Sequence, residues 1–315
     1  MTLLTPLIEQ RADPFIYKHT DGYYYFTASV PAYDHIELRR AKTIAGLADA
    51  QTVNVWQKPE TGPYSDLVWA PEIHFNQGAW YIYVAIAPSR EIKDDLFQHR
   101  MYVLRCTDDN PLTGHWEFLG QLDTGMDTFC LDATTFTHKG QLYYLWAQKE
   151  TGIQGNSNLY IAKMDTPDRI SSTPVMLTKP ELPWEIIGFW VNEGPAVLQR
   201  NGKVFITYSA SATDENYSMG LLTADDDADL LDPSSWSKSQ EPVLKSCFEH
   251  DVYGAGHNSF TVSEDGNDDI LVYHARTYTE IEGDPLWDPN RHTYVKILRW
   301  DENGLPLFGK PSLQE

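Results

Sequence analysis

Cysteine is scarce in this chain of 315 residues, and basic side chains are too few to balance the acidic ones. The three cysteines, Cys106, Cys130 and Cys247, form no even set and no Cys-x-x-Cys pair. We therefore expect no disulfide framework, and this favours a reducing compartment. Residues 1–10 also lack the basic stretch and the apolar run of a secretion signal. Together these absences predict a cytoplasmic protein.

The charge balance excludes some classes of partner. The chain carries 24 basic against 45 acidic residues, a formal net charge of −21. Such a surface repels phosphate backbones and anionic lipids, so we expect neither nucleic acid nor a membrane as partner. No apolar run is long enough to span a bilayer. A neutral oligosaccharide is not repelled, and it is the partner that we expect.

Aromatic residues, by contrast, are abundant, and they fall into a repeat. Five times, a short apolar run is followed by a turn with glycine and by a run rich in aromatic and β-branched residues, which is typical of a β-hairpin. The turn glycines are Gly22, Gly78, Gly140, Gly202 and Gly266, so the spacings are 56, 62, 62 and 64 residues. Strand-only units of that length are typical of a β-propeller.

The segments after each hairpin complete the blades. Third strands are expected at residues 36–41, 101–106, 158–163, 219–224 and 294–299, and outer strands at 53–57, 116–122, 175–178 and 242–244. The fifth outer strand could come from 307–308 or from 3–8, so the terminus that closes the ring stays open. We predict an all-β, five-bladed propeller in which residues 1–315 form one domain, although the length alone would suggest two.

The residues that open the hairpins are candidates for chemistry. Because propeller blades begin at the central axis, Asp13, Glu72, Asp132 and Glu193 are expected to converge in one cavity, where the fifth repeat has His257. Glycoside hydrolysis needs one protonated and one ionised carboxyl group. Positions on different blades favour the wider separation, roughly 6.5–9.5 Å, in which a water molecule attacks directly. A third acid would help to keep the proton donor protonated.

Four motifs, in this order, resemble glycoside hydrolase family 43 over nearly the whole chain: Arg11-Ala12-Asp13-Pro14, Trp69-Ala70-Pro71-Glu72, Leu131-Asp132-Ala133 and Asn192-Glu193-Gly194-Pro195. That family consists of five-bladed propellers, among them inverting arabinofuranosidases, xylosidases and endo-arabinanases. The resemblance implies that Asp13 is the general base, Glu193 the general acid and Asp132 the residue that raises the pKa of Glu193. The alternative for each is an acid that caps a turn or pairs with an arginine.

The resemblance also suggests binding residues. It implies that Trp69 is a wall of the sugar pocket, that Arg291 reaches the hydroxyls of the terminal sugar, and that His257 holds a water or a metal ion near the axis. The ion would be a structural calcium, bound by His257 through waters, since calcium prefers oxygen ligands; no cofactor is required. The alternatives are a surface ion pair for Arg291 and a structural role for His257. Glu72 is expected to be structural, hydrogen-bonding from blade to blade.

Three further segments refine the expected substrate: Trp190–Pro195, Gly256–Phe260 and Asn290–Thr293 resemble exo-acting α-L-arabinofuranosidases that favour 1,5-linked arabino-oligosaccharides. A β-xylosidase of the same family is the second hypothesis. A non-catalytic carbohydrate-binding propeller is the third, and the three acids argue against it. A fructosidase is disfavoured because its Asn-Asp-Pro and Glu-Cys motifs are replaced here by Arg-Ala-Asp-Pro and Asn-Glu-Gly-Pro.

Overall fold

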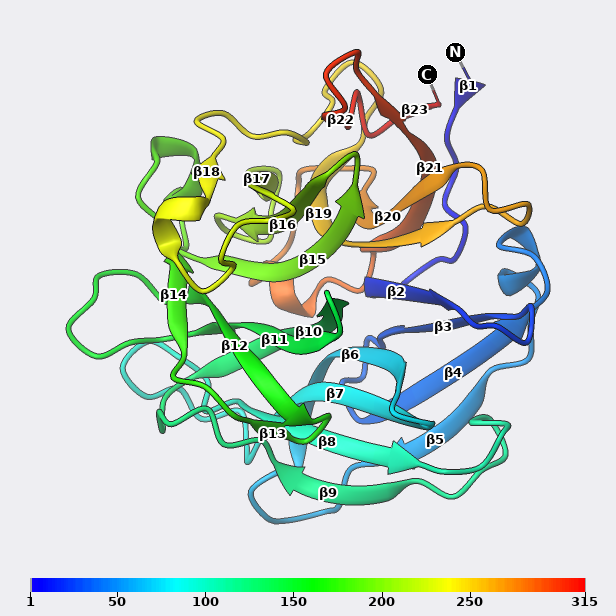
Figure 1. The fold of residues 1–315 in the computed structure, drawn as a ribbon, viewed down its shortest axis with the longest axis vertical. Helices are drawn as coiled ribbons and strands as arrows, with labels where there is room; N and C mark the ends of the chain where they lie inside the picture. The colour runs from blue at the N-terminus through cyan, green and yellow to red at the C-terminus, as the bar shows by residue number, and fades with distance from the viewer. Residues whose placement is uncertain (1, 315) are drawn as a thin grey trace.

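The computed structural model describes residues 2–314, and nearly all of its regular structure is β-strand. Figure 1 shows the strands gathered into five sheets that surround a common centre. Five sheets of four or five strands form the blades and confirm the predicted all-β, five-bladed propeller, and a sixth sheet has only two short strands. None of the helices among the described residues is long and apolar enough to cross a membrane.

Each blade is an antiparallel sheet whose strands follow one another in chain order. The innermost strands are β2 (Ala12–Lys18), β6 (Asp66–Asn76), β10 (Cys130–His138), β15 (Asn192–Arg200) and β19 (Tyr253–Val262). The second strands are β3 (Tyr24–Ser29), β7 (Ala79–Ala87), β11 (Gln141–Gln148), β16 (Lys203–Ala210) and β20 (Asp269–Arg276). The third strands are β4 (His35–Ala41), β8 (Arg100–Cys106), β12 (Asn158–Thr166), β17 (Ser218–Asp225) and β21 (His292–Trp300).

The outer strands are shorter, and they vary more than the inner ones. They are β5 (Val53–Gln57), β9 (Glu117–Gln121), the pair β13 (Arg169–Ile170) and β14 (Val175–Thr178), β18 (Ser237–Lys238) and β22 (Pro306–Leu307). Four 3₁₀ turns lie between strands: η1 (Ala45–Leu47), η2 (Pro183–Glu185), η3 (Pro233–Ser235) and η4 (Pro285–Trp287). In the fourth blade the expected outer segment 242–244 makes only a bridge, from Leu244 to Met219, and β18 is the paired strand.

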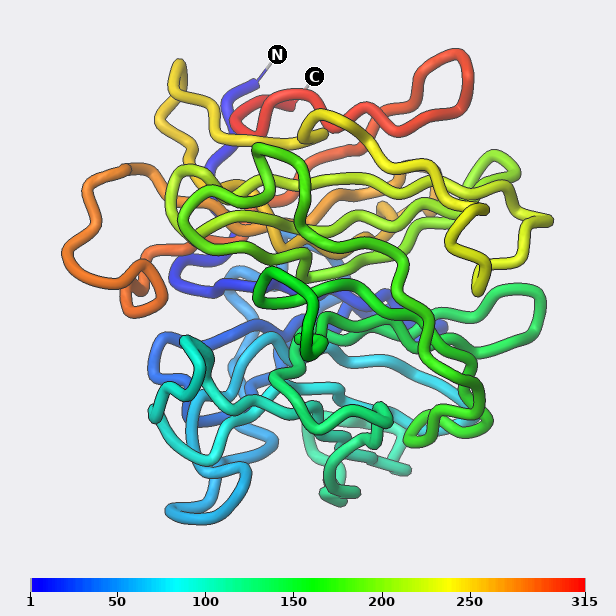
Figure 2. The backbone as a smooth tube through the Cα atoms, turned by 90° about the vertical axis from the view of Figure 1, so that its left-hand side faces the viewer, coloured from blue at the N-terminus to red at the C-terminus, as the bar shows by residue number. Residues whose placement is uncertain are grey.

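The ring closes through both ends of the described chain. The outer strand of the fifth blade, β22, comes from the C-terminal side. The N-terminal side contributes a bridge from Ile8 to Thr293, and β1 (Thr2–Leu3) pairs with β23 (Leu313–Gln314). Figure 2 shows the two ends of the chain lying close together at one edge of the propeller.

The hairpin turns explain the regular glycines. The five turn glycines have φ between 72° and 83°, a left-handed conformation in which a Cβ atom would be strained. Each of these glycines therefore fixes the position at which one strand returns beside the next. The repeat read from the sequence is thus a repeat of backbone geometry.

Some of the abundant aromatic side chains pack between neighbouring blades. The twelve largest fully buried side chains are all Trp, Tyr or Phe. Tyr25 of the first blade meets Trp80 of the second at 4.6 Å between ring centroids, and Tyr83 meets Tyr144 of the third at 5.7 Å. Large rings fill the wedge-shaped space between twisted sheets, and their burial stabilises the ring.

Candidate active site

Each innermost strand has a kink at its axial end. The antiparallel register shifts there in all five blades, and one residue in each kink has a left-handed backbone. The five residues and their φ angles are Asp13 (54°), Ala70 (44°), Asp132 (51°), Gly194 (54°) and His257 (44°). Such bulges bend a strand and redirect its side chains, often beside active sites. These five positions, rather than the positions of the four acids, are the true equivalents among the blades.

Four of the five kink residues donate their N–H groups to the preceding blade. Ala70 N–H donates to Ser29 Oγ at 2.7 Å, and His257 N–H donates to Ser209 Oγ at 2.7 Å. Asp13 N–H donates to Nδ1 of His274 at 3.0 Å. In the fourth blade the acceptor is a carboxylate, because Gly194 N–H donates to Asp132 Oδ2 at 3.0 Å. These bonds tie the strained backbone of one blade to the next and hold the axial ends rigidly.

A cavity of about 400 Å³ lies at these axial ends. All six residues predicted for the site line it, and they come from loops and strands of all five blades: Asp13, Trp69, Asp132, Glu193, His257 and Arg291. Each is at most 9% exposed. Side chains more than 270 positions apart in the chain therefore share one small cavity.

The expectation that Glu72 joins this cavity is wrong. Glu72 is not among the lining residues, and its carboxylate contacts Nε2 of His74 at 2.8 Å. In the second blade the kink places Ala70 where the first and third blades have an aspartate, and Glu72 lies two residues further along the strand. Its partner is on its own strand, not on the neighbouring blade as expected.

Asp13 is surrounded by groups that favour its ionised form. Ser29 donates to Oδ2 at 2.5 Å, while Nδ1 of His257 and Nη1 of Arg291 approach Oδ1 at 3.2 and 3.5 Å. Burial by itself raises the pKa of Asp13, but His257, Arg291 and His274 together lower this pKa well below its ordinary value. Asp13 is therefore a carboxylate at any pH near neutrality.

The two histidines beside Asp13 act as neutral rings. Burial lowers the pKa of His274 to about 3 and also lowers the pKa of His257. Nδ1 of His274 accepts the Asp13 N–H at 3.0 Å and lies 3.3 Å from Asp13 Oδ1, so this ring contacts both the backbone and the carboxylate of Asp13. The permanent positive charge at Asp13 is that of Arg291.

Glu193 and Asp132 have the opposite electrostatic environment. Burial raises the pKa of Glu193 to about 7, with help from the charge of Asp13 and against a hydrogen bond of 2.8 Å from the Tyr217 hydroxyl to Oε1. Burial, followed by the charges of Glu193 and Asp13, raises the pKa of Asp132 well above its ordinary value. Two such buried carboxyl groups titrate as a pair, and this pair retains a proton near pH 7.

Arg291 and Trp69 form part of the wall. The second guanidinium nitrogen of Arg291 donates to the Tyr33 hydroxyl at 2.7 Å, and that hydroxyl donates to the Leu286 carbonyl at 2.7 Å. Trp69 stacks on His99, with ring centroids 3.9 Å apart and an interplanar angle of 24°, and it meets Tyr33 edge-on. Arg291 is thus buried in the cavity wall, which rules out the alternative of a surface ion pair.

The donor atoms at His257 do not fit a directly bound calcium ion. Calcium takes six to eight oxygen ligands, whereas the carboxylates near Nδ1 of His257 are those of Asp13, at 3.2 Å, and Asp132, at 3.8 Å. Both belong to the candidate catalytic set. A calcium ion held through waters stays a prediction.

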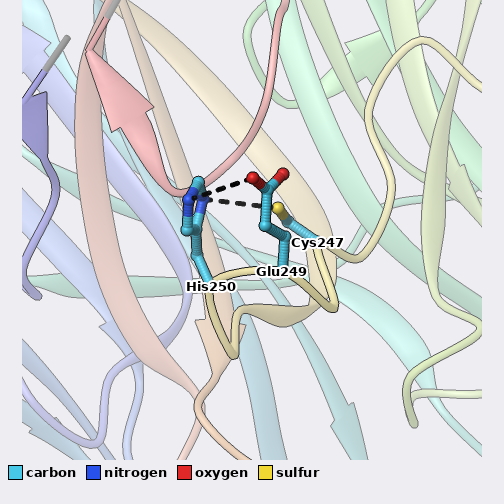
Figure 3. A group of neighbouring side chains, drawn as sticks. All are labelled: Cys247, Glu249 and His250. Atoms are coloured by element: carbon cyan, nitrogen blue, oxygen red, sulfur yellow. Dashed lines mark hydrogen bonds and ion pairs between the residues drawn. The ribbon is translucent and has the colours of Figure 1, made fainter.

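One other group of potential metal ligands occurs among the described residues. Cys247, Glu249 and His250 lie together on one loop (Figure 3). Cys247 Sγ is 3.6 Å from Nδ1 of His250, which also contacts Ser312 Oγ at 2.7 Å, and the carboxylate of Glu249 pairs with the ammonium of Lys310. Because a lysine already neutralises the one carboxylate, the arrangement gives no support for a metal ion.

The family follows from a match that spans most of the propeller. The sequence model of the glycosyl hydrolases family 43 matches residues 4–306. The chain belongs to this family. The match includes the inner strands of all five blades, and it confirms the resemblance carried by the four motifs.

Two relatives and one solved structure are similar to this family 43 chain. The extracellular exo-α-(1→5)-L-arabinofuranosidase of Streptomyces avermitilis is 53% identical over 311 residues, 99% of this chain but 64% of the relative. An extracellular exo-α-(1→5)-L-arabinofuranosidase of Streptomyces chartreusis is 49% identical over 280 residues, 89% of this chain and 84% of the relative. The crystal structure of an α-L-arabinofuranosidase from Lactobacillus brevis is 57% identical, with a TM-score of 0.97 over 99% of this chain and 98% of that one.

The expectation of a cytoplasmic protein is contradicted by this comparison, because both Streptomyces relatives are named as extracellular. The expectation rested partly on cysteines that form no framework. All three cysteines are buried in the structure. A buried thiol packs as a small apolar side chain and is shielded from oxidants, so three such residues give no information on the compartment.

Several site residues were not predicted. Ser29 and His274 support Asp13, Tyr217 holds Glu193, and Tyr33 holds Arg291. A signal for the first two exists in the sequence, because Ser29 and His274 are polar residues near the ends of second strands whose middle residues are mostly apolar. The two tyrosines lie in loops or at strand starts, where nothing in the sequence separates them from the other sixteen.

Proposed function

We propose that this family 43 chain is an inverting, exo-acting glycosidase that releases terminal α-L-arabinofuranose from 1,5-linked arabino-oligosaccharides. The observation that carries the proposal is the opposite titration of carboxyl groups in one cavity: Asp13 is ionised, while the Glu193–Asp132 pair retains a proton. That combination is what hydrolysis of a glycosidic bond requires. The names of the two Streptomyces relatives support arabinofuranose as the sugar.

In the proposed reaction, Asp13 is the general base and Glu193 the general acid. A water molecule attacks the anomeric carbon and gives a proton to Asp13, while the bond to the leaving oxygen breaks and that oxygen takes the proton of Glu193. The released sugar has the inverted anomeric configuration because the attack is direct. Afterwards Asp13 loses its proton to solvent and Glu193 regains one.

Asp132 is proposed to determine where the shared proton lies. Its Oδ2 accepts the Gly194 N–H at 3.0 Å, and this bond opposes the rise in the pKa of Asp132 that burial and the charges of Glu193 and Asp13 cause. We assign the shared proton to Glu193, which directly precedes Gly194 in β15. An ionised Asp132 in turn disfavours an ionised Glu193, and so keeps the acid ready at neutral pH.

Arg291, Trp69 and His257 are proposed to bind the terminal sugar. Arg291 supplies fixed N–H donors for hydroxyl groups, and Trp69 supplies an apolar wall for a sugar face. His257 contacts the carboxylate of Asp13 and lines the same cavity. The substrate is neutral, so the excess of acidic residues on the chain does not repel it.

The direct test is hydrolysis of 4-nitrophenyl α-L-arabinofuranoside and of the matched β-D-xyloside. We expect the arabinoside to be cleaved at least tenfold faster, and proton NMR in the first minutes should detect the inverted sugar. Faster cleavage of the xyloside would establish the β-xylosidase alternative. A retained configuration would refute the roles of Asp13 and Glu193, and binding without cleavage would establish a carbohydrate-binding propeller.

A further inference from the structure

The wall of the cavity is polar and buried in one part, and apolar and exposed in another. The candidate catalytic carboxyls, His257 and Arg291 are polar and almost completely buried. Two other lining residues, Phe189 and Ile92, are apolar yet remain 37% and 59% exposed. They are among the eight large hydrophobic side chains that stay exposed among the described residues. An apolar rim on a polar pocket is typical of a surface that a ligand covers.

Phe189 belongs to the same blade as the proposed acid. It lies four residues before Glu193, in the segment that leads into β15. Protonation of the leaving oxygen by Glu193 requires that the departing sugar lie beside this blade. Phe189 and Glu193 line the same cavity, so we expect the rest of the substrate to leave the pocket past Phe189.

The backbone holds Phe189 in place. Ile187 N–H donates to Ser211 Oγ at 3.0 Å, and Ala212 N–H donates to the Ile187 carbonyl at 2.9 Å. Gly188 has φ of 73°, and a Cβ atom there would lie 2.9 Å from that of Ala212. Phe189 is thus presented by a turn that is fixed to the loop after β16, and it can serve as a preformed platform.

We propose that Phe189, with Ile92 from the loop between β7 and β8, forms the subsite for the leaving sugar. This inference rests on the proposed function. A sugar ring has a C–H face that covers apolar surface and hydroxyl edges that stay in water, which suits a half-exposed ring and a half-exposed aliphatic chain. Asp95 and Asp214 line the same cavity and provide acceptors for those hydroxyls.

The test compares two substrates that differ only in the leaving group. Methyl α-L-arabinofuranoside has a leaving group too small to cover Phe189, and α-1,5-arabinobiose has a full sugar. For Phe189→Ala we expect kcat/KM on arabinobiose to fall about tenfold, from the loss of roughly 50 Å² of apolar contact. The loss should lie mostly in KM, because the contact exists in ground and transition states alike. On the methyl glycoside the change should be less than twofold.

The control is Phe248→Ala. Phe248 is 66% exposed, contacts Tyr253 edge-on at 5.1 Å between centroids and is not among the lining residues of the cavity. Phe248→Ala should leave kcat/KM unchanged on both substrates. A second variant, Phe189→Leu, keeps an apolar side chain and should lose less on arabinobiose than Phe189→Ala does.

Three outcomes would overturn the assignment of Phe189: an equal loss on both substrates, no loss on either, or the same loss in Phe248→Ala. Thermal unfolding of each variant verifies that the fold is intact. Failure of the proposed function itself would be recognised separately, because the unaltered chain would then hydrolyse neither arabinoside.

Discussion

Asp13 and Glu193 are both buried carboxyl groups at the axial end of a blade, and they differ in what surrounds them. Asp13 has a serine hydroxyl, an arginine and a neutral imidazole directed at it. Glu193 has one tyrosine hydroxyl, with Asp132 nearby. Burial raises the pKa of both groups, and only Asp13 has enough donors and charge to reverse the effect. The comparison teaches that the partners, not burial, make the pKa values of these two groups diverge.

The largest effect is expected from Asp13→Asn. The amide is nearly isosteric, but it cannot accept a proton from water, so kcat should fall roughly 10³-fold on any arabinofuranoside. The fold should persist, as judged by circular dichroism and thermal unfolding. Ordinary activity in this variant would remove Asp13 from the mechanism.

Glu193→Gln tests the proposed acid, because its effect on kcat should depend on the leaving group of the substrate. On arabinobiose, whose leaving oxygen needs a proton, we expect kcat to fall about 10²–10³-fold. On 2,4-dinitrophenyl α-L-arabinofuranoside, whose leaving group departs without a proton, the loss should be less than about tenfold. Equal losses on the two substrates would contradict the role of Glu193 as acid.

Tyr217→Phe tests the difference between Glu193 and Asp13 through the pH dependence of kcat/KM. The Tyr217 hydroxyl stabilises the ionised form of Glu193, so its removal raises the pKa of Glu193 above about 7. As the proposed acid, Glu193 acts in its protonated form, and the alkaline limb of kcat/KM should therefore move to higher pH. We expect the ratio of activity at pH 8.5 to that at pH 6.5 to rise about threefold or more. A limb that stays in place or moves to lower pH would refute this account.

Ser29→Ala should have the smallest effect, and it tests the environment of Asp13, the proposed base. Without the Ser29 hydroxyl that donates to Asp13 Oδ2, the pKa of Asp13 rises, so the acidic limb of kcat/KM should move to higher pH. At pH 6 we expect kcat/KM to fall by less than about tenfold. Ser209→Ala is the matched control, because Ser209 binds the kink of the fifth blade in the same way but, among the described residues, donates to none of the candidate catalytic carboxylates. The same shift in both variants would mean that general loosening of the kinks, not the bond to Asp13, is responsible.

The blades themselves were predictable. The turn glycines and the alternation around them gave five hairpins, and the third strands occur where they were expected. Local pattern suffices for this because a two-residue period and a left-handed turn are properties of neighbouring residues. The outer strands were less predictable, because short edge strands depend on what lies beside them, as β18 illustrates.

The identity of the acids followed from the sequence, but their alignment between blades did not. Glu72 and Glu193 stand in segments that resemble the one around Asp13, yet the kinks place Ala70 and Gly194 at the equivalent positions. A bulge changes which side chain points to the axis by one or two residues, and sequence similarity does not register that shift. Gly194 is needed there because a Cβ atom would lie 3.0 Å from the ring of His257.

The sequence by itself determined the number of blades, the family and the carboxyl groups available for chemistry, since these depend on residue types and their order. Only the tertiary structure decided which carboxyls meet, that Asp13 is ionised and that the Glu193–Asp132 pair retains a proton. The reason is that a pKa depends on charges and donors within a few ångströms, and those of Asp13 come from residues 16 to 278 positions away. Closure of the ring brings them together.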